Sequence, residues 1–141
     1  MRVVIDTNVL VSGLLWPYSP SGEIVRMLSS GALEPCYDAR IMSEYEEVLR
    51  RPKFGFDPEK VDVLLDFIRG EGHLCAGQPL SRHLPDPDDE PFLEVAIAGH
   101  AAFLITGNSS HFPVGSCHGA KVTTPRRFVD WWRNLSRESG P

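Results

Sequence analysis

The chain has 141 residues, of which 42% are hydrophobic and 23% are charged, as expected for one globular domain with a substantial core. Its net charge of −5 argues against nucleic-acid binding by phosphate neutralisation alone, so such binding would need a local basic patch or metal ions held by acids. We expect a cytoplasmic protein, because there is no bilayer-spanning apolar run, no signal peptide and no disulfide framework among Cys36, Cys75 and Cys117.

Strands and helices alternate along the predicted chain. In order, we expect a strand over 2–6, helices over about 8–15 and 22–30, a strand over 33–37, helices over about 39–50 and 58–70, an edge strand over 73–76, a helix from the acidic segment 86–91 to residue 99, strands over 102–106 and 121–123, and a last helix after residue 125. This alternation favours an α/β fold with a central parallel sheet of about four to five strands and helices on both faces. Residues 1–135 are predicted to form one domain, and 136–141 a flexible tail.

Two of the predicted strands end in polar corners, Asp6-Thr7-Asn8 and Thr106-Gly107-Asn108. If both strands are central and parallel, both corners lie at the same edge of the sheet, where ligands bind in open α/β folds. Acids of the helix over 39–50 and of the segment 86–90 would join them there. Crowded carboxylates repel one another, and a divalent cation relieves that repulsion. All-oxygen ligands favour Mg²⁺ or Mn²⁺ over zinc, and such an ion can promote hydrolysis of phosphate esters.

Each of these acids also has a simpler interpretation. Asp6 is suitably placed to cap the next helix. Glu44, Glu46 and Glu47 suit a solvated helix face, and the acids of the segment 86–90 suit the dipole of a first helical turn. Thr7, Asn8 and Thr106 are residues that also form turns. From local pattern alone, these interpretations stay open beside the functional one.

Four segments, taken together, resemble PIN-domain proteins. The opening residues 1–15 are similar to the start of that family, and Glu44 to Phe54 resembles the second acidic helix of a subgroup of VapC-like toxin components of toxin–antitoxin systems. Residues 86–93 and 104–108 resemble the third and fourth motifs. The match covers about residues 1–112, in order and with the family's spacing. It implies a small metal-dependent endoribonuclease with a parallel sheet.

The resemblance also implies roles for individual residues. It points to Asp6, Glu44 and Asp89 as catalytic residues and ligands of Mg²⁺ or Mn²⁺, with Asp88 as the alternative to Asp89. Asn108 stands where the family often has an aspartate, and is expected to offer a further, weaker metal ligand. Four residues would support or orient these groups or the substrate: Thr7, Asn8, Asp88 and Thr106.

A basic cluster follows the Glu44 helix, formed by Arg50, Arg51 and Lys53. These residues suit RNA phosphate contacts, and equally suit the negative end of the helix dipole. His111 follows the fourth motif and is expected to be a surface loop histidine. Cys117-His118 lacks a second pair with zinc-ligand spacing, so we expect no zinc site.

The expected partners are an RNA substrate, a cognate antitoxin protein and a second copy of the chain in a homodimer, with no membrane. The apolar residues near Trp16 and in the last helix are the sequence support for the homodimer. One alternative is a catalytically weak or inactive PIN-fold module that binds RNA or a protein. A phosphatase of the haloacid-dehalogenase type also begins with a strand and an aspartate, but it needs a second aspartate where this chain has Asn8.

Overall fold

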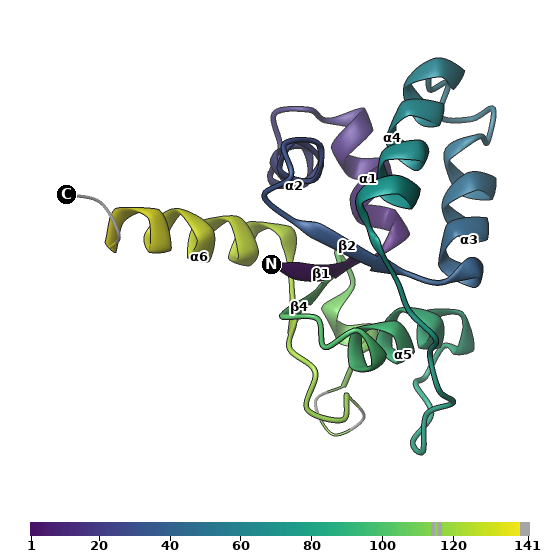
Figure 1. Ribbon diagram of the computed structural model, residues 1–141, viewed down its shortest axis with the longest axis vertical. Helices are drawn as coiled ribbons and strands as arrows, with labels where there is room; N and C mark the ends of the chain where they lie inside the picture. Colours follow the sequence, from purple (N-terminus) through teal and green to yellow (C-terminus); the bar gives the residue numbers. More distant parts are fainter. Residues whose placement is uncertain (114, 116, 139–141) are drawn as a thin grey trace.

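The computed structural model describes residues 1–113, 115 and 117–138. It has a five-stranded sheet in which all neighbouring strands are parallel, in the order β3-β2-β1-β4-β5 (Figure 1). The strands are β1 Arg2–Ile5, β2 Glu34–Tyr37, β3 His73–Leu74, β4 Phe103–Ile105 and β5 Val122–Thr123. The predicted parallel sheet is therefore confirmed, with β3 at one edge as expected.

Six α-helices flank this sheet: α1 Thr7–Leu15, α2 Pro20–Ser29, α3 Ala39–Leu49, α4 Pro58–Glu71, α5 Glu90–Ala98 and α6 Pro125–Glu138. Figure 1 shows α1 to α4 on one side of the sheet and α5 on the other. The short 3₁₀ helices η1 Pro87–Asp89 and η2 Ser109–His111 lie in the connections. Helices therefore cover both faces, as predicted for a parallel sheet.

Local capping residues explain where several helices begin. The Asp38 side chain accepts a hydrogen bond of 3.0 Å from the backbone N–H of Ile41, at the start of α3. Asp57 accepts one of 3.0 Å from Glu59, and Pro58 occupies the first position of α4. Ser19 caps α2 in the same way. Each cap satisfies an N–H group that the helix itself leaves without a partner.

The core lies on both faces of the central strand. Val3, Val4 and Ile5 of β1 are at most 1% exposed, and so are Leu104 and Ile105 of β4. A continuous apolar run of this kind is typical of a strand buried on both faces. The two strands pair in register from Val3–Phe103 to Ile5–Ile105. Their carboxyl ends are therefore level with each other.

The order in which strands are added to the sheet reverses at β1. After β1 the chain adds β2 and β3 on one side of it, and then crosses over to add β4 and β5 on the other side. Such a reversal opens a crevice at the carboxyl ends of the two central strands. Asp6 and Thr106 are the first residues beyond those ends. The strand order therefore brings the two polar corners together.

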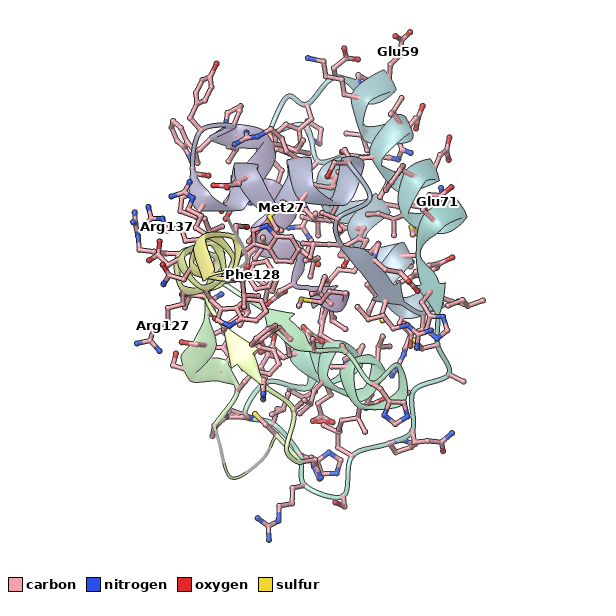
Figure 2. All side chains as sticks on the ribbon, turned by 60° about the vertical axis from the view of Figure 1, so that its left-hand side comes forward. Met27, Glu59, Glu71, Arg127, Phe128 and Arg137 are labelled. Carbon is pink, nitrogen blue, oxygen red and sulfur yellow. The ribbon has the colours of Figure 1, made fainter. Side chains whose placement is uncertain are left out.

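Helix α6 continues to Glu138, into the first residues of the tail predicted over 136–141, and residues 139–141 of that tail lie outside the described residues. Figure 2 shows α6 nearly end on, with Phe128 on the side that faces Met27 of α2. Phe128 is 1% exposed and packs against Phe103, Trp131 and Trp132, and this apolar stripe supports the helix. No helix among the described residues is both long enough and apolar enough to cross a bilayer.

Candidate active site

Asp6 lies at the end of β1 and is 6% exposed. The Thr106 hydroxyl donates a hydrogen bond of 2.7 Å to Asp6 Oδ2, and the Asn8 amide donates a weaker one of 3.3 Å to the same oxygen. Asp6 occupies the N-cap position of α1, but its side chain makes no capping hydrogen bond. The interpretation of Asp6 as a helix cap is therefore wrong, because its carboxylate turns to the neighbouring strand.

The surroundings of Asp6 favour its neutral form. Burial is the largest cause and raises the pKa of Asp6 above its ordinary value, and the negative charge of Asp89 raises it further. The hydrogen bonds from Thr106 and from the backbone of Thr7, and the proximity of His111, act in the opposite direction but do not cancel the effect. Asp6 is thus a buried acid with too little positive charge nearby.

Glu44 reaches the same crevice from α3. The Thr7 hydroxyl donates a hydrogen bond to Glu44 Oε2. Burial raises the pKa of Glu44 most, the hydrogen bond from Thr7 lowers it, and the charges of Asp6, Asp88 and Glu47 raise it. The other two acids of this helix have partners elsewhere, since Glu46 pairs with Arg69 and Glu47 with Arg51.

Tyr45 fixes the position of this part of α3. Its side chain is 1% exposed, and its hydroxyl donates a hydrogen bond to the backbone carbonyl of Ile5, the last residue of β1. Because Tyr45 directly follows Glu44, this bond ties the Glu44 segment to the strand that carries Asp6. The helical spacing of Tyr45 predicts that its side chain is buried, but no local pattern predicts the partner of its hydroxyl.

Asp89 comes from the opposite side of the crevice. It occupies the N-cap position of α5 and, like Asp6, makes no capping hydrogen bond. Its Oδ2 lies 3.2 Å from Nδ1 of His111, which belongs to η2. Burial raises the pKa of Asp89 most and Asp86 raises it further, while His111 lowers it. A histidine that follows the fourth motif therefore contacts an acid of the third.

The neighbouring Asp88 has a different environment. It is exposed, and its backbone N–H donates a hydrogen bond of 2.9 Å to Asp86 Oδ1. Its charge acts on Glu44, whereas the charge of Asp89 acts on Asp6. Asp89 is thus the more buried of the two, with a side chain that is 14% exposed. Both remain within electrostatic reach of the site.

The Thr106-Gly107-Asn108 corner holds itself against the first corner. The backbone N–H of Gly107 donates to Asn8 Oδ1 at 3.1 Å, and that of Asn108 donates to the Thr106 hydroxyl at 3.0 Å. The Thr106 hydroxyl therefore donates a hydrogen bond to Asp6 and accepts one from the backbone of Asn108. Asn108 is exposed, and within the described residues its side chain forms no hydrogen bond. Its amide is therefore not required to hold the turn.

The basic residues after α3 are engaged with their own neighbours. Arg50 pairs with Asp62 at 2.7 Å, and Arg51 pairs with Glu47 at 2.8 Å. The Lys53 ammonium lies 5.1 Å from the centroid of the Phe54 ring. The two arginines would exchange an existing ion pair for any contact with a phosphate.

The acids gather without enclosing a common point. Among residues 1–113, 115 and 117–138, no three His, Cys, Asp or Glu side chains are arranged to hold a metal ion as they stand. The chemistry of the set nevertheless fits a hard cation, because Asp6, Glu44 and Asp89 offer only oxygen and repel one another. A divalent cation would supply the positive charge that these acids lack.

The comparison with known families agrees with this geometry. The PIN domain family model matches residues 2–110, which contain both corners and all three acids. No curated protein matches the chain. PIN domains are generally nucleases that use divalent metal ions. The chain therefore belongs to the PIN-domain family.

Proposed function

We propose that this protein is a divalent-metal-dependent endoribonuclease that hydrolyses phosphodiester bonds in RNA. The observation that carries the proposal is the state of Asp6 and Asp89. Asp6 stands at an N-cap position with extended backbone, where an aspartate would normally accept a capping bond, and it accepts none, while Asp89 lies where η1 runs into α5 and its carboxylate contacts His111. Both lie among other acids. Burial raises the pKa of each most, the charge of Asp89 raises the pKa of Asp6 further, and the charges of Asp86 and Glu44 raise the pKa of Asp89. Buried carboxylates that repel one another and lack a cationic partner are candidates for binding a cation.

In the proposed site, Asp6, Glu44 and Asp89 would hold Mg²⁺ or Mn²⁺. Such an ion supplies charge for a phosphate oxygen, a more acidic bound water and stabilisation of the leaving oxygen. The chain supplies the positioning. Thr106 and Asn8 hold the carboxylate of Asp6, Thr7 holds that of Glu44, and His111 holds that of Asp89. Support of this kind orients metal ligands and raises their effectiveness.

His111 has a second property that suits hydrolysis. It is the one basic side chain within hydrogen-bond distance of the three acids among the described residues. Its side chain is 47% exposed, so the ring also meets solvent beside Asp89. We propose that it orients Asp89 and approaches the phosphate of a bound strand. Its position in η2, directly after the Asn108 corner, makes this contact available.

The proposed biological role is that of a toxin component restrained by a cognate antitoxin protein, acting as a homodimer. The support for the dimer is apolar surface beside the α1–α2 connection, where Trp16 is 67% exposed and Tyr18 is 99% exposed. Light scattering at tens of micromolar is expected to give the mass of two chains, and a monomer would contradict it. Co-purification from the native host, followed by a cleavage assay with the separated components, tests for an inhibitory antitoxin.

A second candidate function is an RNA- or protein-binding module with little or no cleavage. Two observations favour it: Asn108 stands where the family often has an acid, and the carboxylates do not enclose a common point in the described structure. An ion held by three acids rather than four would bind less tightly. The two candidates differ in a direct way, since only the first predicts cleavage that depends on metal.

The deciding experiment is cleavage of a single-stranded RNA with Mn²⁺ or Mg²⁺, against EDTA. Wild-type protein is expected to cleave only with metal, and Asp6→Asn is expected to bind Mn²⁺ more weakly in a calorimetric titration. Asp57→Asn is a matched control, because Asp57 is also an N-cap aspartate but does accept a capping bond. Metal-independent cleavage, or equal Mn²⁺ affinity of Asp6→Asn and wild type, would reject the assignment.

A further inference from the structure

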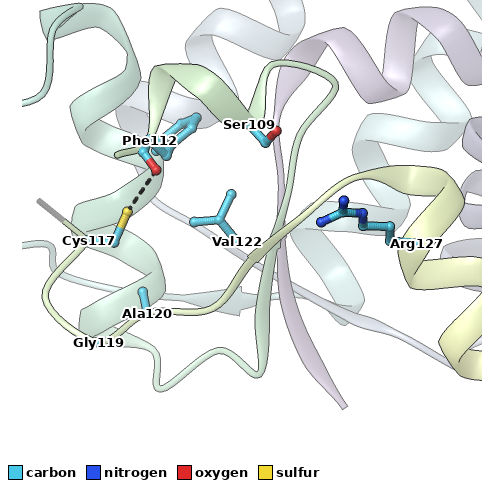
Figure 3. Close-up of a pocket in the computed structure, with 7 residues that line it drawn as sticks. All are labelled: Ser109, Phe112, Cys117, Gly119, Ala120, Val122 and Arg127. Carbon is cyan, nitrogen blue, oxygen red and sulfur yellow. Dashed lines mark hydrogen bonds between the residues drawn. The ribbon is translucent and has the colours of Figure 1, made fainter. Parts of the chain in front are cut away.

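Beside the acidic crevice lies an open pocket of about 410 Å³ that the function proposed above does not use. It is formed by residues that follow the fourth motif and by the segment that leads through β5 into α6 (Figure 3). Seven residues line it: Ser109, Phe112, Cys117, Gly119, Ala120, Val122 and Arg127. Figure 3 shows the Arg127 side chain extending from α6 toward Val122, with Ser109 across the pocket.

The polar groups of this pocket favour an anion. Arg127 is the one charged residue among the seven, and within the described residues its guanidinium forms no ion pair. Six other arginines of the described chain each pair with an acid, namely Arg2, Arg40, Arg50, Arg51, Arg69 and Arg133. The Cys117 thiol is engaged, since it donates to the backbone carbonyls of Phe112 and Pro113. The Ser109 hydroxyl remains as a second donor.

The pocket and the acidic crevice share a wall. Helix η2 spans Ser109–His111, and its first residue lines the pocket while its last contacts Asp89. The backbone N–H of Thr106 also donates a hydrogen bond of 2.9 Å to the carbonyl of Thr123, which joins the end of β4 to the end of β5. One turn of 3₁₀ helix therefore separates the Ser109 wall of the pocket from the histidine that contacts Asp89.

We propose that this pocket binds a backbone phosphate of the RNA substrate, next to the phosphate whose ester bond is cleaved in the same strand. Arg127 and Ser109 would donate the hydrogen bonds to it. The inference rests on the proposed nuclease function. The chain carries a net charge of −5 and its crevice is acidic, so a strand that enters the crevice meets repulsion. The unpaired guanidinium of Arg127, in a pocket that shares η2 with the acidic crevice, offsets that repulsion and fixes the register of the strand. An arginine suits this role, since it donates two parallel hydrogen bonds to phosphate.

The test measures RNA binding in EDTA, where no metal-dependent cleavage occurs. Fluorescence anisotropy of a labelled single-stranded oligoribonucleotide is followed over a series of KCl concentrations. Arg127→Gln is expected to weaken binding about three- to tenfold at low salt and to reduce the slope of log affinity against log salt by about 0.7, the value for one phosphate contact to a single strand. Ser109→Ala is expected to weaken binding less and to leave the slope unchanged.

Arg126→Gln is the matched control. It removes the same charge from the neighbouring position of α6, but Arg126 lines a different hollow with Tyr18 and Glu23. Arg127 is exposed, so thermal unfolding of both variants should match wild type. Equal losses for Arg126→Gln and Arg127→Gln would overturn the subsite, as would a wild-type protein that does not bind the strand. Displacement of RNA by millimolar inorganic phosphate, beyond the effect of chloride at equal ionic strength, would assign the pocket to free phosphate and also overturn it.

The cleavage assay separates this proposal from the function on which it rests. Binding that depends on Arg127 without any metal-dependent cleavage supports the subsite and rejects the nuclease. Metal-dependent cleavage with the same RNA affinity in wild type and Arg127→Gln supports the nuclease and rejects the subsite.

Discussion

Asp38 and Asp6 directly follow the neighbouring strands β2 and β1, and the protein surrounds these two buried acids differently. Asp38 and Glu94 are 8% and 7% exposed, and the Arg40 guanidinium lies 2.7 Å from the first and 3.0 Å from the second. Asp38 also caps α3. Asp6 is equally buried at 6%, yet its side-chain hydrogen bonds come from neutral groups, Thr106 and Asn8.

The difference separates acids whose charge is neutralised within the protein from acids whose charge is not. A buried carboxylate is costly unless it is paired, and Arg40 removes that cost within the protein itself. Within the described part of the chain, Asp6 has no such cation, and Asp89 has only a half-exposed histidine beside it, so the free-energy cost of burying these carboxylates is not offset in the same way. Natural proteins keep such local conflicts chiefly where function needs them. The following experiments test this contrast, from the largest expected effect to the smallest.

The largest effect is expected from removing the charge of Asp6. Asp6→Asn should lower metal-dependent RNA cleavage by at least about a hundredfold. Mutating residues that merely support metal ligands already lowers metal affinity or activity by about 10–100-fold, and Asp6 is proposed as a ligand itself. The fold should survive, since asparagine can still accept the hydrogen bond from Thr106. Cleavage rates with Mn²⁺ and a circular dichroism spectrum check both parts. Undiminished cleavage by a folded variant would show that Asp6 is not in the reaction centre.

The structural pair should respond in stability instead. Arg40→Met leaves Asp38 and Glu94 buried without their cation, and is expected to lower the free energy of unfolding by about 2–3 kcal/mol, less than for a fully buried pair because Arg40 is half exposed. Arg50→Met is the control, since its partner Asp62 is exposed and the expected loss is below about 1 kcal/mol. Urea unfolding measures both. Equal losses would remove the distinction between the two ion pairs.

Asn108→Asp is expected to strengthen the metal site. The added charge would bring Mg²⁺ or Mn²⁺ a fourth acidic ligand, worth about 1–3 kcal/mol, or roughly five- to a hundredfold in affinity. The turn should tolerate the change, because the Asn108 side chain forms no hydrogen bond within the described residues and the corner is held by backbone groups. Calorimetric titrations of Asn108→Asp and Asn108→Ala decide. Two titrations indistinguishable from wild type would leave Asn108 as a turn residue.

The smallest effect concerns pH in the absence of metal. The pKa values of Asp6, Glu44 and Asp89 are raised in the folded chain above their ordinary values of 3.8 for aspartate and 4.5 for glutamate. The stability that these acids contribute is therefore complete at a pH below the ordinary pKa values, and it is lost as the pH rises through the raised pKa values. At about pH 7 and in EDTA, Asp6→Asn should therefore be more stable than wild type by on the order of 1 kcal/mol.

That advantage should shrink as the pH falls toward about 4, where Asp6 of the wild type becomes neutral as well. Urea unfolding of both proteins across this range supplies the comparison. A constant difference between them would mean that repulsion at Asp6 does not limit the stability of the metal-free protein.

Local signals in the sequence predicted most of the elements. Asp38, and Asp57 with Pro58, mark helix starts through contacts that span at most three residues, and each aspartate forms the capping bond. The apolar run Val3–Ile5 likewise predicted a buried strand from residues that are adjacent in the sequence. The alternation of strands and helices then left a parallel sheet as the natural arrangement.

The sequence by itself determined which polar corners follow which strands, and the resemblance selected Asp6, Glu44 and Asp89 among several acids. Only the tertiary structure decided that Asp6 and Asp89 cap nothing, that Thr106 reaches Asp6 across 100 positions, and that His111 lies on Asp89. It also placed Arg40 between two acids and Tyr45 on the end of β1. The physical reason is range. A cap or an apolar stripe depends on neighbours within one helical turn, whereas these contacts depend on the strand order and on the register of β1 with β4, which no local pattern contains.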